Sequence, residues 1–333
     1  MQRTHYVSNC RPRNLQYCLG IALSLLVIQP GTSHASDWPM RPVTIVVPFV
    51  AGGNTDMMAR LAADRLVAKF GHPFVIENRG GAGGTTAAGQ VARAAPDGYT
   101  VLFGAGSQLT LAPLVQKVSY DPDKDLIPVT EFGTGPQILG VKADIPVNTL
   151  QEFIDYVKAH PGKLSYAGVG IQTVTSIAAG VLMARAGLDM TLVPYKGGIQ
   201  AVGDLLAGHV DMYFGNASEM LPHLHSDRIK LIAVATPERI PQAPDLPAVA
   251  ETLPGFQFGS WNGFMVPSGT PKEVIDRLVE GSIEAVHTPS VKEKLIQSGI
   301  VPGGTTPAQV AERFKADKKA FADAVHLMGL KPE

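Results

Sequence analysis

Hydrophobic positions along this chain of 333 residues follow two periods. Short apolar runs rich in β-branched residues are typical of buried strands, and longer segments with apolar positions at helical spacing are typical of helices. We therefore expect strands at 43–47, 74–77, 99–103, 137–141, 164–167, 192–195, 212–214, 231–235 and 264–266. We expect helices at 56–70, 85–94, 150–160, 175–186, 198–206, 271–285, 290–297 and 307–329. Strands that alternate with helices predict an α/β fold whose sheets are mainly parallel and covered on both faces.

The first 35 residues have a different pattern. Arg3, Arg11 and Arg13 precede a short apolar core at 19–28, and small residues follow at 33–35. This order is typical of a secretory signal peptide, which predicts cleavage after residue 35 and export to the periplasm. The apolar core is shorter than the roughly 20 residues that a membrane-spanning helix needs. An uncleaved membrane anchor is the alternative.

Both cysteines of the chain, Cys10 and Cys18, lie in this segment. The mature chain would therefore have no disulfide, no thiolate metal site and no cysteine nucleophile. Loss of the three arginines leaves 25 basic and 29 acidic side chains, a net charge of −4 with histidine neutral. An acidic protein is a poor partner for nucleic acid. An anionic ligand would have to be attracted by local fields, because the net charge repels it.

Two glycine-rich turns connect a strand to a helix. The strand at 43–47 leads through Gly52 and Gly53 into the polar residues at 54–56, and the segment 164–183 repeats this order. N–H groups at the start of a helix have no partner within it, so such a turn directs them at an anion beyond the strand end. Two such turns predict two lobes that close on a ligand carrying carboxylates. We also expect a positive φ at Gly53, which a valine would resist.

Five short motifs occur in order along the chain: PFVAGGNTD at 48–56, ENRGGAGG at 77–84, APDGYTVLFG at 95–104, PGKLSYAG at 161–168 and VPYKGG at 193–198. Together they resemble the substrate-binding proteins of tripartite tricarboxylate transporters, the Bug family of periplasmic receptors. The resemblance extends from about residue 41 to the C-terminal helices, so it covers nearly all of the chain after the predicted signal peptide.

The resemblance implies a type II periplasmic-binding-protein-like fold, with two α/β lobes joined by two crossing strands. The crossings would fall near 138–141 and 262–266. One lobe would comprise residues 36–141 with 262–333, and the other residues 142–261. The tail after the second crossing is expected to pack back on the first lobe.

The resemblance also implies a periplasmic solute receptor. It would bind a small organic mono- or dicarboxylate between the lobes and deliver it to the membrane permease subunits of a tripartite tricarboxylate transporter. A ligand-sensing module for a signalling partner is the alternative, because both would use the same closing cleft. In either case we expect a monomer that needs no cofactor.

Candidate ligand-binding residues follow the strand ends of both expected lobes. In the first lobe they are Phe49, Gly52, Gly53, Asn54, Thr55, Asp56, Ser107 and Gln108. In the second lobe they are Gly170, Thr173, Thr175, Ser176, Tyr195 and Asn216. Loops at the carboxyl ends of parallel strands face the cleft in open α/β sheets. Phe49 would form an apolar wall or belong to the core, and Asp56 would serve the helix start rather than a like-charged ligand. Hydroxyls at the start of a helix are commonly caps, so at least one of the three is expected only to cap.

The chain departs from the family pattern at two places. Relatives commonly have a serine-rich run that ends in histidine, followed four residues later by glutamate. Here residues 173–176 read TVTS and Gly180 follows. Relatives often have Asp-Asn where this chain has Gly215 and Asn216. Loss of that acid should disfavour a ligand amine and favour a plain mono- or dicarboxylate.

Motifs for catalysis are absent from the sequence: there is no GxSxG elbow, no HExxH and no phosphate-binding loop ending in Gly-Lys-Ser/Thr. The segment 80–86, GGAGGTT, approaches a dinucleotide fingerprint but is not followed by the acidic residue that such a site requires. His223 and His225, with Glu219 nearby, could be drawn as a metal site, but we expect the two histidines to be surface residues. The sequence therefore favours ligand binding over an enzyme acting on a carboxylate.

Overall fold

The computed structural model describes Gln2 and residues 37–330, and residues 37–330 belong to one compact unit. The predicted signal peptide, with Cys10 and Cys18 and the cleavage point, lies outside the described residues. Within the described part, no helix combines the length and the apolar character that a membrane crossing requires. The architecture is a mixed α/β fold in which ten strands form one curled sheet, in the order β2-β1-β3-β9-β4-β7-β5-β6 with β8 and β10 beside β4.

The first half of the sheet begins as the hydrophobic pattern predicts. Strand β1 (Val43–Val47) pairs in parallel with β2 (Phe74–Asn78) and β3 (Thr100–Ala105). Helix α1 (Asn54–Phe70) connects β1 to β2, and η2 (Ala82–Gly84) with α2 (Thr85–Ala92) connects β2 to β3. Two short helices that the sequence pattern does not predict follow β3: α3 (Ser107–Thr110) and α4 (Ala112–Val115).

The second half repeats this strand–helix alternation. Its strands are β5 (Ser165–Gly168), β6 (Thr191–Pro194), β7 (Met212–Asn216) and β8 (Ile229–Val234). Its helices are α5 (Leu150–Ala159), α6 (Val174–Ala186), α7 (Gly198–Ala207), α8 (Ala217–Met220), η3 (Leu221–His223) and α9 (Val249–Thr252). Strand β5 pairs in parallel with β6 and β7, whereas β7 and β8 pair antiparallel with β4.

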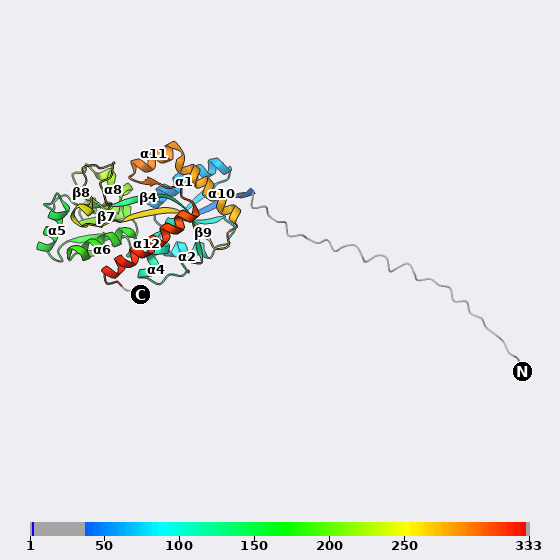
Figure 1. Ribbon diagram of the computed structural model, residues 1–333, viewed down its shortest axis with the longest axis horizontal. Coiled ribbons are helices and arrows are strands. Elements are labelled where there is room, and N and C mark those ends of the chain that lie inside the picture. Colours follow the sequence, from blue (N-terminus) through cyan, green and yellow to red (C-terminus); the bar gives the residue numbers. More distant parts are fainter. Residues whose placement is uncertain (1, 3–36, 331–333) are drawn as a thin grey trace. The chain divides into compact units, whose positions relative to one another are not determined.

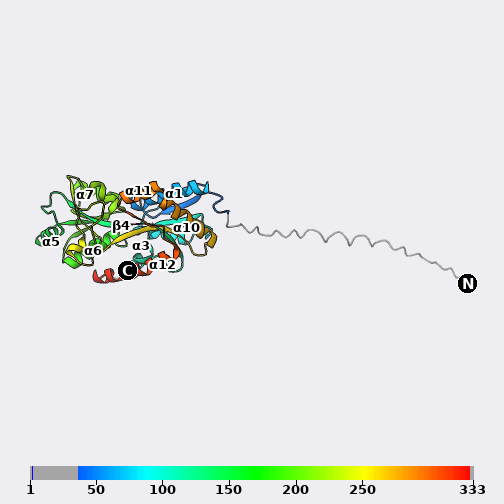
Figure 2. The same cartoon turned by 45° about the horizontal axis from the view of Figure 1, so that its top comes forward.

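Two long strands, β4 (Leu126–Lys142) and β9 (Gly259–Pro267), run through the middle of the fold (Figures 1 and 2). Residues 126–136 of β4 pair antiparallel with β9, and residues 137–142 pair with β7 and β8, so β4 belongs to both halves of the sheet. The sequence pattern predicts only residues 137–141 of this strand. Pro128 and Gly133 obscure its first part, and the pairing register shifts beside both residues. Such irregularities are where a strand tolerates proline and glycine.

The C-terminal segment contains α10 (Lys272–His287), α11 (Pro289–Gln297), β10 (Val301–Pro302) and α12 (Pro307–Leu327). Helix α10 packs on α1, as expected for a tail that returns to the first half. Helix α12 behaves differently, because Phe321, Ala324 and Val325 near its end join the same buried cluster as Ile177 and Leu182 of α6. The expectation that the whole tail packs on the first half is therefore incomplete.

The crossing strands also contribute to the apolar core. Phe264 of β9 packs edge-on against Phe103 of β3, with ring centroids 4.9 Å apart, and Phe132 of β4 lies 5.7 Å from the same ring. All three side chains are fully buried. The strands that connect the two halves are thus themselves packed into the core of the first half.

Two glycines give a matched test of this packing. A Cβ added at Gly263 of β9 would lie 1.9 Å from the backbone oxygen of Thr130 in β4, whereas a Cβ at Gly203 of α7 would meet nothing within 4 Å. We expect Gly263→Ala to lower the free energy of unfolding by about 1–3 kcal/mol, because the two strands must separate. We expect Gly203→Ala to raise it by about 0.5–1 kcal/mol, because alanine is the better helix former. Urea denaturation measures both; equal effects would contradict the close approach of β4 and β9.

Candidate functional site

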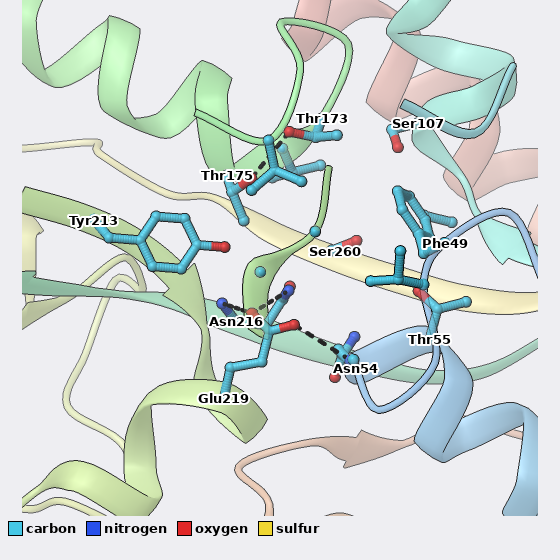
Figure 3. A pocket seen from close by; sticks show the side chains of 17 residues that line it. Phe49, Asn54, Thr55, Ser107, Thr173, Thr175, Tyr213, Asn216, Glu219 and Ser260 are labelled. Carbon is cyan, nitrogen blue, oxygen red and sulfur yellow. Dashed lines mark hydrogen bonds between the residues drawn. The ribbon is translucent and has the colours of Figure 1, made fainter. Parts of the chain in front are cut away.

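A cavity lies where the strand ends of both halves face each other (Figure 3). From the first half it is lined by Phe49, Val50, Gly53, Asn54, Thr55, Ala105 and Ser107. From the second half and β9 it is lined by Val169, Thr173, Val174, Thr175, Gly197, Gly198, Tyr213, Asn216, Glu219 and Ser260. The cavity and its mouth enclose about 540 Å³ free of protein atoms, of which about 50 Å³ admits the centre of a water molecule. This space suits a small ligand held by groups on every side.

Three helices begin at the cavity wall: α1, α6 and α7. The N–H groups of Thr55 in α1, Val174 and Thr175 in α6, and Gly198 in α7 have no hydrogen-bond acceptor among the described residues. Unpaired N–H groups and the positive ends of helix dipoles attract an anion. No lysine or arginine lines the cavity in the described part of the chain, so these backbone groups are its main source of positive potential.

The turn before α1 explains how its N–H groups reach the cavity. Gly52 has φ = 87°, a conformation that favours glycine, and Gly53 has φ = −79°. The positive φ expected at Gly53 is therefore wrong; it occurs one residue earlier. A Cβ at Gly53 would lie 3.5 Å from Oε1 of Glu219, an ordinary contact. Gly53 is thus open to a small side chain, but a larger one would reach into the cavity.

Asp56 holds this turn together from behind and does not line the cavity. Its carboxylate accepts hydrogen bonds from the N–H of Gly52 at 2.9 Å, from Asn78 at 2.9 Å and from Arg60 at 2.9 and 3.1 Å. Burial raises the pKa of Asp56, but these donors outweigh it and lower the pKa below 3.8. Asp56 therefore serves the helix start, as one of the two sequence-based interpretations has it.

The hydroxyls of α6 form a capping network at the opposite wall. Thr173 is the N-cap: its Oγ1 donates to the backbone oxygen of Gly170 at 2.9 Å and accepts from the N–H of Ser176 at 3.4 Å. Oγ1 of Thr175 lies 2.9 Å from Oγ1 of Thr173. Oγ of Ser176 accepts from the N–H of Val169 at 3.0 Å, and Ser176 does not line the cavity. Thr173 and Thr175 are therefore the hydroxyls placed at the cavity wall.

The structure brings together eight of the fourteen residues that the sequence nominates: Phe49, Gly53, Asn54, Thr55, Ser107, Thr173, Thr175 and Asn216. The other six, Gly52, Asp56, Gln108, Gly170, Ser176 and Tyr195, do not line the cavity. Gln108 donates to the backbone oxygen of Gly83 at 3.0 Å. The hydroxyl of Tyr195 donates to Asp204 at 2.7 Å, and burial together with that carboxylate raises the pKa of Tyr195 to about 12. These side chains support the loops around the site.

Glu219 is a cavity residue that the sequence-based candidates do not include. Its side chain is buried, and its Oε1 accepts from the N–H of Asn54 at 3.3 Å. Its Oε2 accepts from the N–H of Asn216 at 3.4 Å and from Nδ2 of Asn216 at 3.1 Å. Burial raises the pKa of Glu219, while these donors act against the rise. A sequence signal existed: Asn216 and Glu219 are spaced as a capping box, which turns the glutamate back toward the strand end.

Tyr213 is a second missed residue. It comes from β7, is only 1% exposed, and its hydroxyl meets no hydrogen-bond partner among the described residues. Figure 3 shows this hydroxyl directed into the cavity between Thr175 and Glu219. Burial raises the pKa of Tyr213 well above its usual value, and the charge of Glu219 adds to the effect. A buried hydroxyl without a partner is costly, so a ligand group is the natural partner for it.

Comparison with known proteins gives a consistent result. Residues 58–326 match the family described as "Tripartite tricarboxylate transporter family receptor". A protein of Pseudomonas sp. strain P51, named for the tcbD-tcbE intergenic region, is 35% identical over 91% of this chain and 90% of its own length. The structure of Rpa4515 of R. palustris with adipate is 34% identical, with a TM-score of 0.86 over 89% of this chain and all of that one. MatC of Rhodopseudomonas palustris with bound malate is 35% identical, with a TM-score of 0.83 over 86% of this chain and all of that one. The fold is therefore the periplasmic-binding-protein-like fold that the motifs imply.

The supporting role of Asp56 can be tested by pH. Asp56→Asn should lower the free energy of unfolding at neutral pH, because the amide cannot attract Arg60 as a carboxylate does. The pKa of Asp56 is lowered below 3.8 in the folded protein. The contribution of its carboxylate to the free energy of unfolding is therefore fully present above pH 3.8 and is lost as the pH falls through the lowered pKa. Urea denaturation from pH 7 to pH 3 should show the variant and the parent converging only at the acid end. Asp64→Asn, an exposed change on the same helix, is the control; a gap independent of pH would contradict the assignment.

Proposed function

Because the chain belongs to the tripartite tricarboxylate transporter receptor family, we propose that it is a periplasmic solute receptor for a small organic mono- or dicarboxylate. The observation that supports this most directly is the convergence of three helix starts on one cavity, with unpaired N–H groups and threonine hydroxyls at its wall. Two solved structures similar to this chain are described as holding adipate and malate, and both molecules are carboxylates.

The energetics of such a site are favourable. A carboxylate taken from water must regain its hydrogen bonds, or it loses several kcal/mol. Each helix start contributes about 0.3–1 kcal/mol, and up to about 2 when partly buried. Each charge-assisted hydrogen bond adds about 1.5–3 kcal/mol. A few such bonds reach the roughly −8 kcal/mol of a micromolar complex after the costs of association. This binding needs no covalent chemistry, and an enzyme acting on a carboxylate is the less supported alternative.

Ligand binding would be coupled to closure of two lobes, residues 36–141 with 262–333 and residues 142–261. Contacts between these two parts of the chain would hold the closed arrangement. Ser218 donates from its hydroxyl to Oδ1 of Asn54 at 2.7 Å, and a Cβ at Gly83 would overlap the side chain of Gln172. Each pair joins a residue of one proposed lobe to a residue of the other. A ligand that replaces water between them would favour the closed arrangement.

Delivery of the ligand to a membrane permease is the transport role that family membership favours. A sensing role, in which the closed receptor contacts a signalling partner, uses the same cavity and is the second candidate. Co-purification from membranes distinguishes them: a receptor for uptake is captured with permease subunits, whereas a sensor is captured with a signalling protein.

Carboxylate recognition can be tested by titration calorimetry. A thermal-shift screen of aliphatic and aromatic acids identifies the acid that stabilises the protein most, since a ligand at 100 times its dissociation constant adds about 2.7 kcal/mol. The amide of that acid should bind more weakly, because an amide has no negative charge for the helix starts to attract. Equal affinities for acid and amide would refute the proposal.

Variants of the two walls complete this test. Gly53→Val, whose methyl groups would extend toward Glu219 and into the cavity, should weaken binding more than Thr175→Ala, which removes one hydroxyl and leaves the N–H groups of α6. Small-angle scattering with and without the acid reports closure for each. A Gly53→Val protein that binds and compacts like the parent would mean that this turn is only structural.

The proposed periplasmic location predicts a processed N-terminus. Mass spectrometry of the protein from the periplasmic fraction should find a chain beginning near Ser36, because the basic, apolar and small-residue order of residues 1–35 is typical of a cleaved signal peptide. An intact N-terminus in the membrane fraction would instead support the anchor.

A further inference from the structure

The position of Glu219 narrows the ligand class. Resting on the proposed function, we propose that Glu219 makes the receptor select carboxylic acids that also carry a hydrogen-bond donor, a hydroxyl or an amine, over unsubstituted acids. The ligand carboxylate would lie at the start of α6, and the donor would face Glu219. This is a role in specificity, within the cavity already described.

Glu219 occupies the space between the starts of α1 and α7. Its Oε1 accepts from the N–H of Asn54, the first residue of α1. A Cβ at Gly198, the first residue of α7, would lie only 2.2 Å from Oε2 of Glu219. In this position the carboxyl group occupies space that a side chain at residue 198 would need. The positive ends of α1 and α7 already have an acid of the protein beside them.

The start of α6 has no such acid. Its first turn contains no acidic residue, and the N–H groups of Val174 and Thr175 have no acceptor among the described residues. Like charges in a cavity of low dielectric repel one another strongly. A ligand carboxylate is therefore favoured at α6, with its hydrogen bonds from Val174 and Thr175, and disfavoured beside Glu219.

Glu219 can still accept a hydrogen bond. A carboxylate has about four lone-pair sites, and three hydrogen bonds reach this one from Asn54 and Asn216, while the hydroxyl of Tyr213 lies close to it without completing a fourth. Each of these donors is a neutral amide, so a hydroxyl or an ammonium of a ligand would complete the set. The hydroxyl of Tyr213, 1% exposed and without a partner in the described part of the chain, offers the ligand a second contact on the same side. Burial raises the pKa of Glu219, and a donor from the ligand would stabilise its ionised form.

This inference revises what the sequence alone favours. Gly215 removes the acid that relatives often have at that position, which by itself argues against a ligand amine. A side chain at 215 would displace its neighbours, because a Cβ would lie 2.6 Å from the ring of Tyr213 and 2.7 Å from Met220. Glu219 supplies a carboxyl group to the cavity from the next helix instead.

Matched acids provide the test. Three sets are titrated by calorimetry into the parent protein: propionate, lactate and alanine; succinate, malate and aspartate; glutarate, 2-hydroxyglutarate and glutamate. Adipate is included as a longer unsubstituted acid. In the set that fits the cavity, a donor-bearing member should bind at least about tenfold more tightly than the unsubstituted acid. Preference for the amino over the hydroxy acid would identify the donor as an ammonium, and the reverse as a hydroxyl.

Variants assign the preference to Glu219. Glu219→Gln should reduce it by weakening the donor-bearing acid, whereas the unsubstituted acid should bind as tightly as before or more tightly, because the repulsion from Glu219 is removed. Glu238→Gln, the same change at an exposed position, should leave it intact. Melting curves verify that each variant is folded. Glu219→Asp is the second variant: it keeps the negative charge but shortens the side chain by one methylene, so it should retain only part of the preference.

The outcomes separate the two proposals. Tight binding of an unsubstituted acid, with no gain from a hydroxyl or an amine and no effect of Glu219→Gln, would overturn the role of Glu219 and leave the carboxylate receptor standing. A preference for donor-bearing acids that survives both Glu219 variants would also overturn that role. Failure of every acid to bind the parent protein would overturn the proposed function and this inference with it.

Discussion

Backbone N–H groups without acceptors are the constraint around which this molecule is built. Each helix must leave its first N–H groups unpaired by the helix itself, and here α1, α6 and α7 begin at the same cavity. Burying such groups is costly unless something accepts from them. Glu219 accepts from the N–H of Asn54, whereas the N–H groups of Thr55, Val174, Thr175 and Gly198 have no acceptor in the part of the chain that the structure describes.

The parallel units alone would not bring these helix starts together. A strand–turn–helix unit places its helix start beyond the carboxyl end of its strand, and each half of the sheet has its own set of such ends. Strand β4 joins the halves because its first part pairs with β9 and its last part with β7 and β8. The close approach at Gly263 and the packing of Phe103, Phe132 and Phe264 hold this junction in register.

Features that depend on residues close together in sequence could be predicted, whereas features that depend on distant segments could not. The β1–α1 unit and a hydroxyl cap at the start of α6 follow from local rules of periodicity and caps, and both are found in the structure, where the cap is Thr173. The first part of β4 was not predictable in this way, because Pro128 and Gly133 oppose a strand locally and only its pairing with β9 makes them acceptable. Glu219 is an intermediate case. Its capping box with Asn216 could be predicted from the sequence, but its contact with Asn54, 165 residues away in sequence, could not.

The packing of helix α12 affects the conformation of the protein without ligand. Val310 near its start belongs to a cluster with Ala87 and Leu102 of the first half, and Phe321 and Val325 near its end belong to the cluster of α6. If the halves part, this helix has to leave one of them. Each 100 Å² of apolar surface exposed in that step costs about 2.5 kcal/mol, a shift of roughly 70-fold in an equilibrium constant. In the absence of ligand, the contacts of α12 would then set the balance between the open and the closed form. Mutations in this helix could therefore change the ligand affinity without contacting the ligand.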